Sequence, residues 1–265
     1  MVRHGSQQAF EVIDFTLHAY RRYLLAISRA YPVILRFDEF FRLTVPPSAF
    51  CLIRHDVDRK PNHALAMAAL ERSFGVRTTY YFRVKQHTLK PKIIRQIHRM
   101  GHEIGYHYES LSDTRGDMEA ALVDFHRNLE KLRRIAPVRT VSMHGQPLSP
   151  FDNRDLWRDA IHRRFLKKRF NILGEIYLDI DYRDVLYVSD TGRNWTTDRA
   201  NRRDRVGSDC AIDFSNGQVL IAYLNNQPHP RLVFQIHPER WATTAVDYGI
   251  QWIADWAINR IKALL

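Results

Sequence analysis

Apolar residues follow two different spacings along the chain, and the alternation between them predicts the order of strands and helices. Residues 8–30 carry apolar side chains at three- and four-residue steps, which predicts an N-terminal helix. From residue 50 onward, short apolar runs alternate with amphipathic stretches. The runs predict strands at 50–53, 78–84, 103–108, 139–143, 171–176, 185–188, 219–224 and 232–236, and the stretches predict helices at 62–75, 91–100, 117–135 and 243–265. Strands that alternate with helices are typical of a parallel sheet or barrel.

The same pattern predicts a single domain over residues 1–265. It consists of an N-terminal helix at about 8–30, a barrel at about 50–238 and a closing helix at about 243–265, with no repeat or low-complexity stretch between them. Residues 190–209 are polar and rich in arginine, and they predict a long loop on the substrate side.

Composition excludes several classes of protein. Hydrophobic residues make up 45% of the 265 residues and charged residues 26%, as in an ordinary folded domain and unlike a disordered or collagen-like chain. Two cysteines, Cys51 and Cys210, are too few for a disulfide scaffold, so we expect free thiols. No run reaches the roughly 18 apolar residues of a membrane span. Glu11 and Asp14 interrupt any signal-peptide pattern, so a cytoplasmic location is expected.

The net charge of +11 favours an anionic partner. Basic residues are dense at 158–169 and 193–205, where they can meet an anionic glycan, a nucleotide or a lipid head group. The codon usage of a GC-rich genome explains the arginine content equally well. A nucleic-acid-binding protein is a further alternative, but the chain shows no nucleic-acid-binding motif, so no specific nucleic acid is expected as a partner.

Histidines and aspartates stand at the carboxyl ends of four predicted strands. They are Asp56 and Asp58, His107, His144 and His237. The carboxyl ends of parallel strands share one face of a sheet or barrel, so these side chains are expected to converge. Each residue alone has a structural explanation, such as a helix cap. Together they suit zinc or another divalent ion with an open coordination position.

The residues around these positions resemble a divergent branch of the polysaccharide deacetylases. The resemblance rests on RHDVD at 54–58, GHEIGYHYE at 101–109, SMHG at 142–145 and IHP at 236–238, and it extends over roughly residues 52–238. Proteins of this family are metal-dependent hydrolases built on an incomplete (β/α) barrel, usually with seven strands. The resemblance therefore implies an α/β fold of this kind.

The first motif of the family holds two neighbouring aspartates, a general base and a metal ligand. Here Asp56 and Asp58 stand in these places, separated by Val57. Side chains two residues apart in a strand point the same way, so both can reach one pocket. We assign Asp56 as the base and Asp58 as the ligand, although the two roles can be exchanged.

The second motif departs from the family pattern. It normally holds two histidines four residues apart; His107 matches the first, and Leu111, which cannot bind a metal, occupies the place of the second. A catalytic zinc takes three protein ligands, so another residue must replace it. His144 and Glu109 are the candidates, and we prefer His144 because it follows a neighbouring strand. The resemblance thus implies one divalent ion, zinc, on Asp58, His107 and His144.

The late histidine of the family, which protonates the leaving amine, corresponds to His237. The resemblance implies hydrolysis of a non-peptide amide bond, with Asp56 and His237 on opposite sides of the barrel opening. The expected substrate is an N-acetylated sugar, glycan or nucleotide-sugar in surface-polysaccharide biosynthesis. The alternative is a catalytically silent barrel that binds a glycan or nucleotide-sugar, which the leucine at position 111 favours.

Three residues are candidates for contacts with the substrate. Trp195 and Trp241 can form a platform for a sugar ring, and Arg193 can bind a phosphate of a nucleotide-sugar. For the two tryptophans, packing in the core or at the rim is an equally good interpretation.

Overall fold

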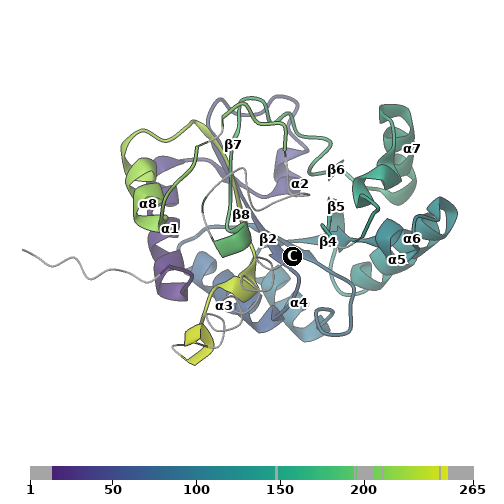
Figure 1. Cartoon of the computed structure of the whole chain (residues 1–265), viewed down its shortest axis with the longest axis horizontal. Coiled ribbons are helices and arrows are strands. Elements are labelled where there is room, and N and C mark those ends of the chain that lie inside the picture. The colour runs from purple at the N-terminus through teal and green to yellow at the C-terminus, as the bar shows by residue number, and fades with distance from the viewer. Residues whose placement is uncertain are drawn as a thin grey trace, which may run out of the picture.

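Eight strands form one sheet in the computed structural model, which describes residues 14–146, 149–193, 195, 206–210, 212–244 and 246–249 (Figure 1). The strands are β1 (Ile34–Leu35), β2 (Phe50–Val57), β3 (Thr79–Phe82), β4 (Glu103–Tyr108), β5 (Val138–Met143), β6 (Gly174–Glu175), β7 (Leu186–Ser189) and β8 (Arg231–Ile236). All paired strands run parallel, as the strand–helix alternation predicts.

The sheet curls into an incomplete barrel. Its strand order is β6-β5-β4-β3-β2-β8-β7, so β2 to β8 follow one another in chain order around a ring. The ring closes where β8 pairs with β2, and it stays open between β6 and β7. The short strand β1 lies beside the first half of β2, where Ile34 is in register with Cys51. The prediction of an incomplete barrel of about seven strands is confirmed.

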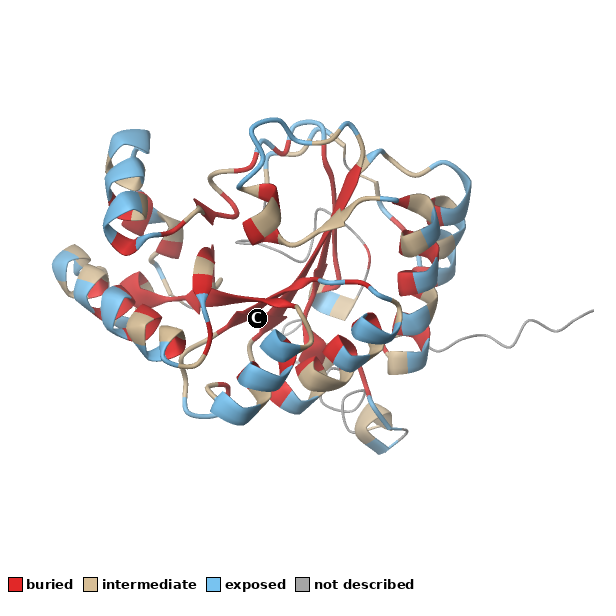
Figure 2. Cartoon of the chain, turned by 180° about the vertical axis from the view of Figure 1, so that it is seen from behind, coloured by how far each residue is buried: buried red, intermediate tan, exposed pale blue. Residues whose placement is uncertain are grey.

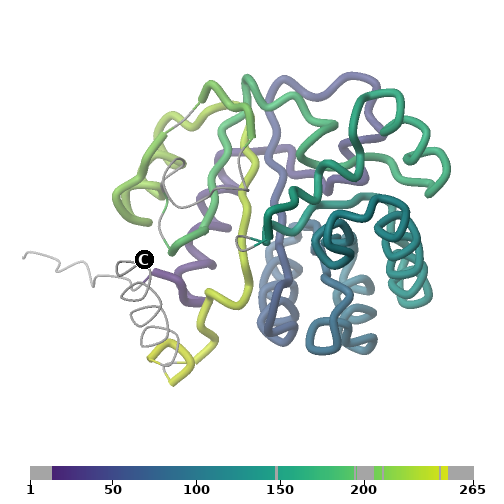
Figure 3. The backbone as a smooth tube through the Cα atoms, turned by 45° about the vertical axis from the view of Figure 1, so that its right-hand side comes forward, coloured from purple at the N-terminus to yellow at the C-terminus, as the bar shows by residue number. Residues whose placement is uncertain are grey.

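Helices surround the outer face of the sheet, and their exposed sides point away from it (Figures 1, 2 and 3). They are α1 (Leu17–Ala30), α3 (Pro61–Ser73), α4 (Pro91–Arg99), α5 (Ser110–Asp113), α6 (Met118–Arg133), α7 (Ala160–Phe170) and α8 (Gly217–Asn226), whereas the short helix α2 (Phe37–Phe40) lies at the amino end of the barrel. Helices α1 and α8 contact each other on one flank, and α3 contacts α4. Because helices cover the outside and side chains fill the inside, β2 is buried along its whole length.

Side-chain alternation along the strands separates the barrel interior from the helical layer. On β8, Leu232, Phe234 and Ile236 pack in one apolar cluster with α1 and α8, whereas Val233 belongs to a second cluster that includes the barrel interior. The intervening Gln235 points inward and binds Asp56 of β2. This period of two brings polar side chains to the carboxyl end of the barrel on its inner side.

Gly105 of β4 leaves room for a ring inside the barrel. A Cβ atom at this position lies 2.2 Å from two ring atoms of Tyr81. The Tyr81 hydroxyl reaches Thr140 of β5 at 3.0 Å, and Thr140 donates to the buried carboxylate of Glu103 at 2.5 Å. The amino end of the barrel is filled by α2, whose Asp38 amide also donates to Glu103, at 2.9 Å. The glycine within the GHEIGYH segment is therefore required by packing.

Three predicted elements differ from the structure: the helices at 8–30 and 62–75 and the strand at 219–224. The first helix begins at Leu17, after the N-cap Thr16, and residues 8–13 lie outside the described part of the chain. Helix α3 begins at Pro61, one residue before the predicted start, because the fixed φ of proline suits the first helical position.

The predicted strand at 219–224 is part of helix α8. The side chain of Asn216 accepts hydrogen bonds from the amides of Gln218 and Val219 and so caps the helix. Leu220 and Leu224, one helical turn apart, are both buried. A short apolar run does not distinguish a buried strand from a buried helix, and the cap decides between them.

Other expectations have mixed outcomes. Both cysteines are free, Cys51 buried and Cys210 half-buried. Of the predicted closing helix, residues 250–265 lie outside the described part. Within the described residues, no helix has the length and apolar character that a membrane crossing requires.

We expect Gly105→Ala to lower the free energy of unfolding by about 1–3 kcal/mol, because the added methyl group overlaps the Tyr81 ring in a filled interior. Urea unfolding followed by circular dichroism measures the change. Gly207→Ala is the control, since no atom lies within 4 Å of a Cβ at that position. Equal stability of the two variants would contradict this account of Gly105.

Candidate active site

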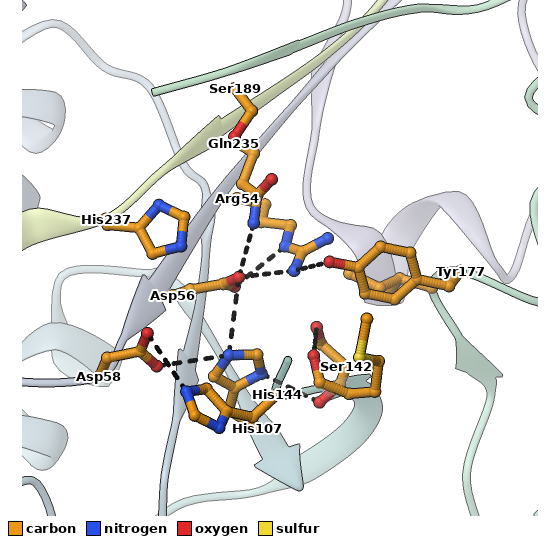
Figure 4. A network of polar contacts seen from close by, with 12 residues as sticks. Arg54, Asp56, Asp58, His107, Ser142, His144, Tyr177, Ser189, Gln235 and His237 are labelled. Carbon is orange, nitrogen blue, oxygen red and sulfur yellow. Dashed lines mark hydrogen bonds and ion pairs between the residues drawn. The ribbon is translucent and has the colours of Figure 1, made fainter. Parts of the chain in front are cut away.

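A buried ion pair lies at the centre of the carboxyl end of the barrel. Arg54 and Asp56 of β2 both point inward, and Arg54 donates to both Asp56 oxygens, at 2.9 and 2.5 Å (Figure 4). Gln235 of β8 donates a third hydrogen bond to Asp56, at 2.8 Å. Burial raises the pKa of Asp56, but the Arg54 guanidinium outweighs burial and holds the pKa well below its usual range. Asp56 is therefore an ionised, fixed carboxylate.

Three potential metal ligands converge next to this carboxylate. Asp58 follows β2, His107 comes from β4 and His144 follows β5, and one donor atom from each lies within 4.8 Å of the others. His107 Nε2 is 3.4 Å from Asp58 Oδ1, and His144 Nε2 is 3.5 Å from Asp58 Oδ2 (Figure 4). Asp56 Oδ2 lies 3.6 Å from His107 Nε2, so it borders the same space.

The ring of His107 is oriented by a backbone carbonyl. Its Nδ1 lies 3.0 Å from the carbonyl oxygen of Ser142 on β5, to which it donates. The lone pair of Nε2 then faces the two aspartates. Burial lowers the pKa of His107 below 6.5 despite the nearby aspartates, which favours the neutral form that binds metals.

Glu109 lies behind His144. Its Oε2 is 3.1 Å from His144 Nδ1, and its carboxylate also accepts hydrogen bonds from Arg83 and from Gln146. Burial raises the pKa of Glu109, but the contacts with His144 and Arg83 outweigh burial and hold it low. His144 and Glu109 were the two candidates to replace the missing ligand. His144 belongs to the three-residue group, and Glu109 contacts His144 Nδ1, whereas His144 Nε2 faces Asp58. Such carboxylate–histidine contacts orient metal ligands in known sites.

The donor set fits a divalent metal ion. Asp58 Oδ1 is buried and has no hydrogen-bond partner among the described residues, which is costly for a carboxylate oxygen unless a cation satisfies it. Two imidazole nitrogens and a carboxylate are ligands that zinc accepts. Tetrahedral zinc with bonds of about 2.0 Å separates its nitrogen and oxygen ligands by about 3.3 Å, and each of the two histidine nitrogens lies near this distance, 3.4 or 3.5 Å, from one of the two Asp58 oxygens.

His237, which follows β8, is held by Asp190 at the end of β7. Its Nδ1 lies 2.6 Å from Asp190 Oδ1, and its backbone amide donates to Asp190 Oδ2 at 2.9 Å. Trp241 Nε1 donates to Oδ2 as well, at 2.8 Å. Burial and Arg240 lower the pKa of His237, but Asp190 outweighs them and raises it to about 8. The imidazole is thus protonated at neutral pH.

Strand pairing corrects the expected placement of Asp56 and His237. Strands β2 and β8 are neighbours, with His55 in register with Ile236, so the two residues lie side by side and not across the opening. Figure 4 shows Asp56 between His237 and His107. Leu111, at the place of the missing histidine, is buried in the apolar core.

The predicted sugar platform of Trp195 and Trp241 is wrong. Their side chains are 2% and 0% exposed and lie in the apolar cluster beneath α1, where Trp195 stacks on Phe234. Their ring faces are covered because burial of a large aromatic surface contributes more free energy to folding than burial of a smaller side chain. Arg193 donates to the Arg240 carbonyl at 2.8 Å, and its role toward a substrate stays a prediction.

Several residues of the site were missed by sequence reasoning. Asp190 was read as the start of a loop, yet it is fully buried. Of the remainder of the predicted loop, residue 194 and residues 196–205 lie outside the described part. Gln235 is two residues before His237, and that spacing alone was a signal that both side chains face inward. Glu239, also buried, lies near Asp58, whose charge adds to burial in raising the pKa of Glu239 to about 7.

No family model matches the chain, and no curated protein matches its sequence. Several solved structures of polysaccharide deacetylases resemble it. A Streptococcus mutans CE4 esterase is 13% identical over 86% of this chain and 87% of its own, with a TM-score of 0.46. The catalytic domain of a peptidoglycan N-acetylglucosamine deacetylase from Eubacterium rectale is 14% identical over 76% and 82%, with a TM-score of 0.44. A mutant of a CE4 family pseudoenzyme with restored activity is 13% identical over 81% and 62%, with a TM-score of 0.39.

We expect Asp190→Asn to lower the pKa of His237 from about 8 toward its ordinary value of 6.5, because the variant removes the negative charge beside Nδ1. NMR titration of the imidazole measures this shift. Because the folded-state pKa is raised, the protonated ring stabilises the native state fully below about pH 6.5, and this contribution is lost as the pH rises through 8. The advantage of the parent in free energy of unfolding should therefore shrink as the pH rises from about 6.5 to about 8.

Asp181→Asn is the control for this experiment, since the Asp181 side chain is 61% exposed and pairs with Arg183. It should leave the His237 titration unchanged. An unaltered His237 pKa in Asp190→Asn would show that Asp190 does not set the charge state of the ring.

Proposed function

We propose that this chain is a metal-dependent hydrolase that removes an N-acetyl or related acyl group from an amino sugar or glycan precursor. The observation that supports this most strongly is the grouping of Asp58, His107 and His144 beside an ionised Asp56 and a protonated His237. A ligand set, a carboxylate and a proton donor together supply what hydrolysis of an amide requires.

In this proposal Asp58, His107 and His144 hold one zinc ion. Bound there, the ion would supply Lewis acidity toward the acyl oxygen and would acidify water. The role of the chain itself is to orient these ligands. Ser142 does so for His107 through Nδ1, and Glu109 lies behind His144.

Asp56 is the proposed proton acceptor. Its Oδ2 borders the ligand group, 3.6 Å from His107 Nε2, and can accept a hydrogen bond from a water bound beside the two. Arg54 and Gln235 restrict the carboxylate to one orientation, which favours a fixed water position. Its low pKa makes it a weak base, so it serves best toward a water that is already acidified.

His237 is the proposed proton donor toward the leaving amine. Asp190 holds Nδ1, which leaves the Nε2–H to deliver the proton. A pKa of about 8 keeps this proton in place at neutral pH and still allows its transfer. An amine nitrogen that has not received a proton is a poor leaving group. The proton from His237 therefore determines whether the C–N bond breaks.

The proposed substrate is an N-acetylated sugar, glycan or nucleotide-sugar of surface-polysaccharide biosynthesis, and a net charge of +11 is compatible with an anionic precursor. A catalytically silent, glycan-binding barrel is the second candidate, and the buried Leu111 favours it because one expected ligand is absent. Metal content distinguishes the two, since the silent barrel has no need of the ion.

We expect His107→Ala to lose the bound metal while it stays folded, because the remaining residues supply only two ligands. Elemental analysis of the purified variant measures the metal, and circular dichroism verifies the fold. His98→Ala removes an exposed histidine and should keep the metal of the parent protein. Unchanged metal content in His107→Ala would mean that the ion is bound elsewhere.

We expect Asp56→Asn and His237→Ala each to lower the rate of acetate release by about 10²-fold or more, with metal retained. In the parent, the alkaline limb of the pH–rate profile should lie near the His237 pKa of about 8. It should disappear in His237→Ala, and the acidic limb should disappear in Asp56→Asn.

An Asp56→Asn enzyme with full activity would assign the base to another group. A parent protein with no bound metal and no turnover on N-acetylated sugars and nucleotide-sugars would instead support the silent barrel.

A further inference from the structure

A second cluster of potential metal ligands lies at the opposite end of the barrel. Asp184 stands two residues before β7 and His229 two residues before β8, and Cys210 belongs to the described segment 206–210. Because β7 and β8 run parallel, this is the amino end of both strands, whereas the candidate active site lies at their carboxyl ends.

The three donor atoms have the spacing of metal ligands. Asp184 Oδ1 lies 3.2 Å from His229 Nε2, Cys210 Sγ lies 3.4 Å from the same nitrogen, and all three atoms lie within 4.8 Å of one another. Tetrahedral zinc, with bonds of about 2.0 Å to nitrogen and oxygen and about 2.3 Å to sulfur, separates such ligands by about 3.3 and about 3.5 Å. The observed distances agree with both values.

The histidine ring has the orientation that a metal ligand needs. His229 Nδ1 accepts a hydrogen bond from the Arg231 amide at 3.2 Å and lies 3.0 Å from the Arg231 carbonyl oxygen. In the tautomer that binds a metal, the proton lies on Nδ1 and is donated to this carbonyl, and the Nε2 lone pair faces the thiol and the carboxylate. A backbone carbonyl on the far nitrogen is common among histidines that bind zinc.

The arrangement does not suit a nucleophilic triad. In such triads the carboxylate holds the ring nitrogen opposite to the one that faces the nucleophile. Here Asp184 and Cys210 approach the same nitrogen.

Neighbouring contacts hold the ligands close to these positions. Arg231 binds Asp184 Oδ2 at 3.1 Å, which leaves Oδ1 directed at His229. Ser208 donates to the Val185 carbonyl at 2.7 Å, and the Asp209 amide donates to the Arg183 carbonyl at 3.1 Å. These two hydrogen bonds hold the chain before Cys210 next to the start of β7. Cys210 Sγ also lies 3.7 Å from that Arg183 carbonyl.

We propose that Asp184, Cys210 and His229 bind a zinc ion, with water as the fourth ligand. On binding, the Cys210 thiol releases its proton to solvent and a zinc–thiolate bond forms. The ion joins segment 206–210 to the amino ends of β7 and β8, beside the open edge of the barrel. The site is separate from the candidate catalytic residues, which lie at the other end of these strands.

Cobalt(II) is the probe that tests this site separately from the active site. A cobalt–thiolate bond gives a sulfur-to-metal charge-transfer band in the near ultraviolet, whereas the Asp58–His107–His144 group contains no sulfur. The other cysteine, Cys51, is fully buried in the apolar cluster beneath α1. The metal-free full-length chain is titrated with cobalt(II), as parent and as variants.

We expect the band to appear in the parent, to persist in His107→Ala and Cys51→Ala, and to disappear in Cys210→Ser and His229→Ala. Zinc should displace the cobalt and slow the reaction of Cys210 with a thiol reagent in the parent. In Asp184→Asn, whose side chain is 64% exposed and therefore tolerant of change, the band should need more cobalt to reach half its height.

Absence of the band in the folded parent, or its persistence in Cys210→Ser, would overturn the proposal. Neither result depends on hydrolysis. If the protein deacetylates sugars but shows no band, only the proposal of a second site is overturned. If it shows the band but no turnover, only the proposed function is overturned.

Discussion

The site is organised around one buried ion pair, Arg54 with Asp56. Both side chains belong to β2 and point into the barrel, with exposures of 0% and 2%. Two unlike charges are costly to bury, and removal of one partner from such a pair costs about 3–5 kcal/mol. Here Gln235 satisfies Asp56 further, and Tyr177, beyond β6, accepts from Arg54 at 2.7 Å. The pair therefore links β2 with β8 and with the far edge of the barrel.

The order of the strands explains why Asp56 and His237, the proposed base and acid, are neighbours. The ring closes between β2 and β8, so Asp56 and His237 lie on paired strands, and the opening falls between β6 and β7. Each group depends on a partner from a neighbouring strand: Gln235 contacts Asp56, and Asp190 contacts His237. The opposite pKa shifts of the two groups follow from these partners, because Arg54 stabilises a negative charge and Asp190 a positive one.

Sequence reasoning predicted that Asp58, His107 and His144 converge, but it misplaced the two tryptophans, for a physical reason. Asp58, His107 and His144 each stand at or just after a strand end, and parallel strands bring such positions together whatever the loops do. Trp195 and Trp241 were chosen for their chemistry alone. Burial of a tryptophan depends on what packs over it, and only the folded chain shows that α1 covers both.

The sequence by itself determined the alternation of strands and helices, the inward-facing pairs on β2 and β8, and the motifs at the carboxyl ends. These features depend on local period and on neighbours in the chain. The tertiary structure decided which strand closes the ring, that Asp190 holds His237, and that Asp184, Cys210 and His229 meet at the other end. Those contacts join residues far apart in sequence, so they form only once the chain has folded and its strands are paired.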